Sequence, residues 1–456
     1  MGDWFVHAGE ARTGPHPAEH VVHWVATGQV PPDAAFWPDG GADWLTLAQA
    51  WPLLTGIPGA VPGVPTAPLP PLPPLPPQGS PLPPQGSPLP PQPTAAAPGP
   101  ARNPVQAVTD RLADFAGVER LDGFRPRDLL SATFHRYSRD ELEQHFATGL
   151  PGFTPQLAAI ESGWPKPWMF VRLFAGTGLL FVGFLFLTNT FGNENLLPGM
   201  ILLGSFAVPL STLVFFFELN TPRNVSLYLL VRCMMVGGLI SLAVTLFLGP
   251  ATSVLGQYVD PLLTGVVEEA AKLFAVFLVT LRLQPQRYPW ILNGVLFGAA
   301  IGAGFACFES AGYAFHYLLT TPESPVAGQW FNVPAATHVI VVRGLLAPFG
   351  HVVWTALVAG ALWRVKLDRR LSARMLFHPR VARMALVVTV LHAIWDVGFL
   401  DPPFLIKYLL LGAVAWLLAF GMLQAGLKQI KAAQMSAAAG DPAVSGATGV
   451  LRGVRG

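Results

Sequence analysis

Cysteine and charge are both scarce in this sequence. Only two cysteines, Cys233 and Cys307, occur among 456 residues, and both lie inside apolar runs, which excludes a disulfide framework and a thiolate metal site. Charged residues make up 12% of the chain, against about a quarter in ordinary soluble domains. The N-terminus has no basic start with an apolar run behind it, so we expect no signal peptide. These shortages exclude a simple soluble globular protein.

The charge balance gives no indication of a nucleic-acid partner. The formal net charge is +2, and the basic residues fall in short clusters beside apolar runs rather than along one face. We therefore expect no binding of nucleic acid.

Apolar residues are abundant and account for 52% of the chain. Nearly all long apolar runs follow Met169, and a spanning helix needs about 20 apolar residues. We therefore predict an all-α polytopic membrane protein with about eight transmembrane helices, preceded by a small α+β domain. The predicted spans are 169–191, 196–217, 225–248, 258–281, 290–318, 338–363, 383–400 and 403–425.

Lysine and arginine in the short loops predict the orientation of these helices. The loop at 364–383 is the most basic, and the loops at 223 and 282–287 also carry arginine. The loops that alternate with them contain neither residue; they lie around Asn193, Ser253, Glu323 and Asp401. By the positive-inside rule the basic loops, both termini and the N-terminal domain are cytoplasmic, and the lipid bilayer surrounds the helices.

The chain divides by composition into five segments. Residues 1–56 are dense in tryptophan, 57–104 are dominated by proline, and 105–168 have an ordinary soluble composition. The membrane domain then occupies 169–427, and we expect 428–456 to be a disordered tail.

A regular order of glycine, proline and aromatic residues marks the first segment. It consists of Gly14-Pro15-His16, then Val21, Trp24 and Gly28, and finally Asp43-Trp44. This order resembles that of GYF-type domains, which are small α+β adaptors that bind proline-rich peptides on an aromatic surface. The resemblance covers about fifty residues.

For this segment the resemblance implies peptide contacts from Trp4, Pro15 and Trp24. The sequence departs from the family where the eponymous Gly-Tyr-Phe reads Gly28-Gln29-Val30, so two aromatic contacts for proline are absent. The alternative is that the tryptophans form the core of a very small domain.

The proline-rich segment has 20 prolines in the 47 positions from 58 to 104. Such a composition lacks backbone donors and apolar bulk, which favours an extended polyproline spacer. The competing interpretation is that its repeated Pro-Leu-Pro-Pro units are ligands for a GYF-type surface. The following segment, 105–168, has a helical pattern: Ser138 and Glu141 form a capping box, and Gly149 can end that helix.

Several predicted spans contain ionisable side chains, each of which costs about 2.5–3.5 kcal/mol at a helix centre. Arg172, Arg232 and Lys407 lie close enough to an interface to snorkel. The others are confined to the fourth to seventh spans and comprise Glu268, Glu269, Lys272, Glu309, Arg343, His351, His392 and Asp396. A helical rise of about 1.5 Å per residue places Glu268, Glu309, His351 and His392 roughly 12–20 Å below the outer surface. A shared depth on four helices predicts a common site.

Helical spacing adds local pairs to this layer. Glu268 and Lys272 are four residues apart on one helix face, whereas Glu269 and Lys272 are three apart, so geometry favours Glu268 as the lysine's partner. His392 and Asp396 are also four apart. A stripe of small residues, Gly294, Gly298 and Gly302, allows a close helix approach next to Glu309.

These residues form four motifs in sequence order. They are Glu268-Glu269-Ala270-Ala271-Lys272 (EExxK), Phe305 to Glu309 (FxxxE), Arg343 to His351 with Pro348 between them, and His392 to Asp396 (HxxxD). Together they resemble the PrsW family of bacterial intramembrane proteases, relatives of the CAAX-processing protease superfamily. The resemblance implies a bacterial inner-membrane protease whose substrate is a single-pass or membrane-anchored protein, such as an anti-sigma factor.

The resemblance and the polar layer leave the catalytic mechanism open. One of Glu268, Glu269 and Glu309 is expected to be the base that activates water. His351, His392 and Glu309 could hold Zn²⁺ with an open position for water, or the histidines could donate hydrogen bonds to the oxyanion without a metal. The supporting residues are Lys272, Phe305, Arg343 and Asp396.

Two other functions compete with proteolysis. A proton-coupled transporter or channel could use the same buried carboxylates and histidines as a relay. However, the charged cluster of spans four to seven has no counterpart in the first four, as duplicated transporters usually would have. An inactive membrane scaffold with a cytoplasmic adaptor would have no reason to bear the insertion cost of the cluster.

Overall fold

The computed structural model describes residues 3–8, 11–26, 30, 34–38, 44–55, 104–121, 123–150, 152–251, 259–320, 331–397 and 405–438. The chain forms two units, Met1–Ala95 and Ala96–Gly456, and each is described by itself. The predicted proline-rich segment lies outside the described residues except for Pro104, which begins a helix.

The N-terminal unit is a four-stranded antiparallel sheet with two helices. Its strands are β1 (Asp3–Ala8), β2 (Ala11–Pro17), β3 (Ala35–Pro38) and β4 (Leu45–Thr46), in the order β2-β1-β3-β4, and its helices are α1 (Ala18–Ala26) and α2 (Leu47–Thr55). Trp4 and Val6 of β1 are buried and His7 is exposed, as the two-residue period of a strand with one buried face requires. The predicted small α+β unit is therefore present.

The aromatic residues of this unit have different environments. Trp4 is only 4% exposed and belongs to the core with Val21 and Phe36, so it offers no surface to a ligand and its predicted peptide contact is wrong. Trp24 is partly exposed. Its ring and that of His16 pack edge to face, with ring centres 4.7 Å apart. Pro15 lies in β2, and its side chain is outside the described part of the chain.

Six helical stretches in the described residues are long and apolar enough to cross a membrane. They are α6 (Met169–Phe191), η2 (Glu194–Leu196) with α7 (Leu197–Leu219), α8 (Leu227–Arg232) with η3 (Cys233–Gly237) and α9 (Gly238–Leu248), α11 (Ile291–Thr320), α12 (Val333–Leu346) with η5 (Ala347–Phe349) and α13 (His351–Lys366), and α15 (Ile406–Ala438). They coincide with six of the eight predicted spans.

The other two predicted spans are also helices but are less apolar. They are α10 (Asp260–Thr280) and α14 (Pro379–Asp396). Each carries charged side chains in its length, among them Glu268, Glu269 and Lys272 on α10. The polar residues that suggest a site therefore also weaken the apolar signal of these two helices.

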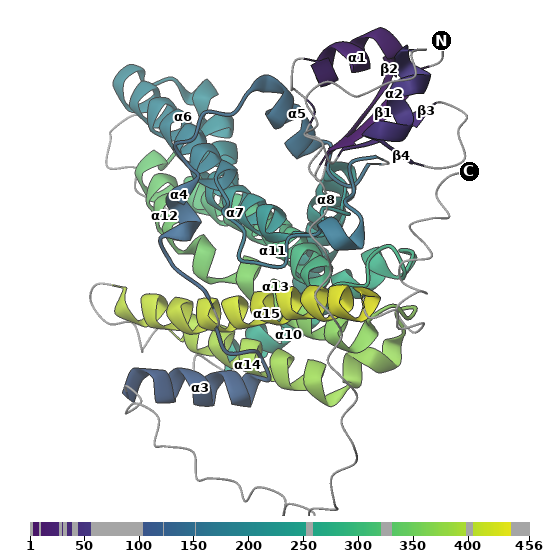
Figure 1. Ribbon diagram of the computed structural model, residues 1–456. Helices are drawn as coiled ribbons and strands as arrows, with labels where there is room; N and C mark the ends of the chain where they lie inside the picture. Colours follow the sequence, from purple (N-terminus) through teal and green to yellow (C-terminus); the bar gives the residue numbers. More distant parts are fainter. Residues whose placement is uncertain are drawn as a thin grey trace, which may run out of the picture. The chain divides into compact units, whose positions relative to one another are not determined.

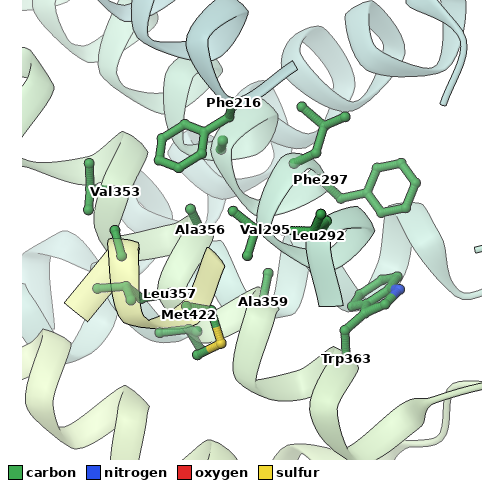
Figure 2. Close-up of a cluster of buried hydrophobic side chains, with 14 of the residues drawn as sticks. Phe216, Leu292, Val295, Phe297, Val353, Ala356, Leu357, Ala359, Trp363 and Met422 are labelled. Atoms are coloured by element: carbon green, nitrogen blue, oxygen red, sulfur yellow. The ribbon is translucent and has the colours of Figure 1, made fainter. Parts of the chain in front are cut away.

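Helix α11 is the centre of the membrane unit. Of the residues in its most apolar 18-residue stretch, 94% are buried inside the protein. None of the residues in the corresponding stretch of α6 is buried, so α6 is peripheral. Figure 2 shows Val295 of α11 beside Ala356 of α13, and Phe297 of α11 on the side of Trp363 of α13, with Phe216 of α7 and Met422 of α15 in the same buried cluster. This apolar core fixes the helices that carry the polar layer.

The segment between the two predicted domains packs against the membrane unit. It contains α3 (Pro104–Ala116), α4 (Asp128–Ser131), α5 (Arg139–Phe146) and η1 (Leu157–Ala159). Helix α3 runs beside α14 and α15 (Figure 1). Trp164 Nε1 donates to Gln424 Oε1 at 3.0 Å, and Glu119 pairs with Lys428 at 3.0 Å. The segment is thus part of the membrane unit rather than a separate domain.

Two local predictions in this part of the chain need correction, and one is confirmed. The capping box is present, because Glu141 N donates to Ser138 Oγ at 3.2 Å and Ser138 N donates to Glu141 Oε2 at 2.6 Å. Helix α5 ends at Phe146, before Gly149. Gly149 has a φ of 78° and packs against the backbone of Val225. Helix α15 continues to Ala438, so 428–438 is helical and only 439–456 lies outside the described residues.

Candidate active site

The predicted polar layer converges on one cluster. Glu268 Oε2 of α10 lies 3.6 Å from His392 Nε2 of α14 and 3.9 Å from His351 Nδ1 of α13. Glu309 of α11 joins through its Oε2, which is 3.1 Å from His351 Nε2. The side chains that helical rise assigned to one layer therefore lie close together.

Helix α10 contributes a buried carboxylate pair with its lysine. Lys272 is fully buried, and its Nζ lies 2.6 Å from Glu269 Oε1 but 3.6 Å from Glu268 Oε2. The expectation that Glu268 is the lysine's main partner is therefore wrong. Lys272 Nζ also lies 2.8 Å from His351 Nδ1 and 4.5 Å from the centre of the Phe305 ring, so contacts from two other helices hold it on the Glu269 side.

Glu269 orients His392. The distance from His392 Nδ1 to Glu269 Oε1 is 2.8 Å, and Lys272 keeps that carboxylate charged, so Nδ1 is the protonated nitrogen in the neutral ring. Nε2 then faces Asp396 Oδ2 at 3.3 Å and Glu268 Oε2 at 3.6 Å. Two carboxylate oxygens therefore face an unprotonated ring nitrogen, which requires a proton or a metal ion between them.

Glu309 and Arg343 form the side of the cluster contributed by α11 and α12. Arg343 Nη2 donates to Glu309 Oε2, and Arg343 Nε donates to Ser310 Oγ at 3.0 Å. The guanidinium also lies over the Tyr313 ring, 4.5 Å from its centre. These contacts hold the Glu309 carboxylate next to His351.

A break between α12 and α13 positions His351. Pro348 has no backbone N–H, and Gly350 is extended, so the helix stops at η5 and restarts at His351. The predicted glycine stripe confirms close packing here, because a Cβ at Gly302 would meet the carbonyl oxygen of His351 and lie 2.9 Å from Thr355 Oγ1. The close approach of α11 to α13 therefore sets the depth of the imidazole.

The charges of the cluster do not balance among its own residues. Its carboxylates outnumber its permanent cations by two when the imidazoles are neutral; the carboxylates belong to Glu268, Glu269, Glu309 and Asp396, and the cations to Lys272 and Arg343. Buried charge of one sign is costly unless it is compensated. A divalent cation or two additional protons would supply the missing charge.

The residues present fit a zinc ion. Glu268, His351 and His392 offer ligand atoms that all lie within 4.8 Å of one another, and Zn²⁺ prefers this mixture of imidazole nitrogen and carboxylate oxygen. Glu268 Oε2 is buried and has no hydrogen-bond partner among the described residues, as a ligand atom awaiting an ion would. The sequence predicted Glu309 as the third ligand beside the two histidines. In the structure the third donor of this compact group is Glu268 instead.

One neighbour of the cluster was not apparent from the sequence. Trp354 is fully buried, its ring centre lies 4.7 Å from that of His392 and 5.3 Å from that of His351, and its Nε1 has no partner among the described residues. Its position one helical turn after His351 is the signal that could have found it.

Comparison with known proteins gives one match. The searches of curated proteins and of solved structures found none. The model of the PrsW family intramembrane metalloproteases matches residues 225–438, a range that contains all the side chains of the cluster. This part of the chain is therefore similar to the PrsW family intramembrane metalloproteases.

Proposed function

We propose that the chain is an intramembrane endopeptidase that hydrolyses peptide bonds of membrane-anchored proteins. The observation that carries the proposal is the buried Glu268 Oε2, which has no hydrogen bond among the described residues and faces two imidazoles among apolar helices. The family match supports a protease over the proton relay that the same charges could form.

In the proposed reaction Glu268 is the general base. Its Oε2 accepts a proton from water, the water oxygen attacks the carbonyl carbon of the scissile bond, and the same proton then passes to the leaving nitrogen. Lys272 and Glu269 hold His392 in one tautomer, and Arg343 holds Glu309 against His351. Zinc, when held by Glu268, His351 and His392, would polarise the carbonyl and activate water. In that case Glu268 is a ligand, and Glu309 is the base in its place.

The proposal is tested with purified full-length protein in liposomes. A single-pass reporter should be cut within its transmembrane segment, and mass spectrometry of the fragments would locate the cut. Cleavage confined to the water-exposed ends of the reporter, or cleavage that persists with Glu268→Gln protein, would contradict it.

The membrane arrangement is part of the proposal. All eight predicted helices span the bilayer of a bacterial inner membrane, with both termini in the cytoplasm, as the basic loops favour. In this arrangement the N-terminal unit is a cytoplasmic adaptor for proline-rich peptides, with Trp24 rather than Trp4 among its contacts. A membrane-anchored anti-sigma factor is the substrate that the resemblance favours.

Truncation should separate the adaptor from catalysis. We expect a protein that begins at Asn103 to fold and to cleave a generic reporter at a rate within about twofold of the full chain, because the segment from Pro104 packs on α15 and is retained. A protein that begins at Met169 loses the contacts of Glu119 and Trp164 with α15 and should unfold at a lower temperature. A folded but inactive Asn103 truncation would show that the front contributes to catalysis.

The glycine at the contact between α11 and α13 should control activity. We expect Gly302→Ala to lower the cleavage rate at least tenfold, since its Cβ would displace the His351 carbonyl, and a catalytic group misplaced by 1 Å can cost on the order of 100-fold. Gly312→Ala on the same helix is the control, because a Cβ there meets no atom within 4 Å. Equal rates for the two variants, measured on the same reporter, would contradict this role.

A further inference from the structure

An apolar cavity outside the polar cluster lies between α4, α6, α7, η5 and α15. It has a volume of about 460 Å³, and none of its lining side chains is charged. Leu129 lines it from α4, Phe170 from α6, Val208 from α7, Pro348 from η5 and Trp416 from α15. Four of these five elements belong to candidate membrane helices, so hydrocarbon is the neighbouring solvent.

The two hydroxyl groups in the lining are already satisfied. Ser211 Oγ donates to Ala207 O at 2.6 Å, and Thr212 Oγ1 donates to Val208 O at 2.9 Å, both within α7. The cavity therefore presents almost only carbon to an occupant, which selects an apolar chain over a polar ligand.

Aromatic and basic side chains mark the membrane surface at one end of the cavity. Tyr137 stacks on Trp168 with ring centres 3.9 Å apart. Arg172 Nη2 donates a hydrogen bond to the carbonyl oxygen of Thr133 at 2.7 Å. Tyrosine and tryptophan are enriched at headgroup depth. From Phe215 to Val208, the α7 wall descends about 10 Å toward the bilayer centre.

Positive charge lies at the same end. Pro126 lines the cavity, and its two neighbours, Arg125 and Arg127, are exposed. Asp128 is the adjacent acidic residue, so this short stretch has one excess positive charge. A phosphate at headgroup depth would complement it.

The lining and the charge beside it indicate the occupant. The lining side chains offer almost only carbon contacts over about 10 Å of α7, and the excess positive charge of Arg125 and Arg127 lies at one end. An acyl chain that ends in a phosphate matches both features. We propose that this cavity binds one acyl chain of an anionic phospholipid, whose phosphate lies on Arg125 and Arg127.

This lipid site is connected to the polar cluster through Pro348. Trp416 Nε1 donates to Pro348 O at 2.9 Å, and Pro348 precedes His351 by one short turn. An occupant packs against the segment that sets the start of α13. Any effect of the lipid on cleavage rests on the proposed function, whereas its binding does not.

The test measures retained lipid by native mass spectrometry of full-length protein released from phosphatidylglycerol or phosphatidylcholine nanodiscs. Wild-type protein should retain one phosphatidylglycerol. Val208→Phe fills part of the cavity and should lower lipid retention roughly tenfold. This is the expected effect when about two methylene groups of the acyl chain can no longer be buried. Leu202→Phe, an exposed position on the same helix outside the cavity, should retain lipid as the wild type does.

Headgroup selectivity is tested separately. Arg125→Gln and Arg127→Gln should each lower the preference for phosphatidylglycerol over phosphatidylcholine roughly fivefold. Arg139→Gln, an exposed arginine of α5 paired with Glu143, should leave the preference unchanged. If Val208→Phe fails to fold, Leu130→Asp serves instead, because this cavity residue is 56% exposed and its carboxylate would repel the phosphate.

Retention of lipid at wild-type level by the folded Val208→Phe and Leu130→Asp proteins would overturn the proposal. So would a Val208→Phe protein that keeps its lipid but no longer binds the single-pass reporter, because the cavity would then receive substrate. Glu268→Gln protein should retain lipid normally, so failure of the proposed protease function would leave this result standing.

Discussion

Glu268→Gln protein should cleave a single-pass reporter about 100- to 10,000-fold more slowly than the wild type, the usual contribution of a general base. Glutamine has nearly the same shape but cannot accept the proton from water. The replacement removes one of the uncompensated negative charges of the cluster, so we expect no loss of thermal stability. The measurement is the initial cleavage rate of the variant, made on protein whose yield and unfolding temperature equal those of the wild type.

Two further variants sharpen this experiment. Glu194→Gln, which changes an exposed carboxylate at the start of η2, should leave the rate unchanged. Glu269→Gln should also slow cleavage, because the acceptor that Lys272 and His392 share loses its negative charge. Full activity in both the Glu268→Gln and the Glu269→Gln proteins would refute the protease assignment.

The zinc content of Glu268→Gln protein distinguishes two roles for this carboxylate. Loss of bound zinc together with activity identifies Glu268 as a ligand, as its place in the compact donor group suggests. Loss of activity with zinc retained identifies it as the base.

His351→Ala and His392→Ala should each abolish stoichiometric zinc binding and cleavage. Each removes one of three donors, and zinc held by two protein ligands is far weaker than in a site with three. A strong chelator should likewise stop cleavage by the wild type, and added Zn²⁺ should restore it. The measurements are metal content by mass spectrometry and cleavage rate on the same preparation.

A matched histidine controls for non-specific effects. His316 is exposed on α11, outside the cluster, and His316→Ala should retain both zinc and activity. Undiminished cleavage by metal-stripped wild-type protein would instead favour the mechanism in which the histidines donate to the oxyanion.

The sequence alone determined which helices carry the chemistry. An ionisable residue in an apolar run is so costly that its presence is a signal in itself, and helical rise converts its position into a depth. That is why Glu268, Glu309, His351 and His392 could be assigned to one layer before any contact was known. The same argument identified the helix positions of α10 and α14, although their charges weaken the apolar signal by which spans are found.

Partner choice within the layer was decided only by the tertiary structure. Spacing along α10 favours Glu268 as the partner of Lys272, but Phe305 of α11 and His351 of α13 hold the ammonium group nearer to Glu269. Helical periodicity describes one helix at a time and contains no information about which neighbour lies across the interface. The lack of a hydrogen bond at Glu268 Oε2 follows from those neighbours.

The same limit explains the other differences. Trp4 fits the aromatic pattern of a binding surface, yet the strand alternation of β1 and its packing on Phe36 bury it. Trp354 and the docking of 105–168 on α15 have no motif, because each arises from contacts between residues far apart in the chain. The sequence thus determined the identity of the charged groups and their common layer, whereas side-chain packing across helices decided which of them are hydrogen-bonded to one another and which carboxylate oxygen has no hydrogen bond.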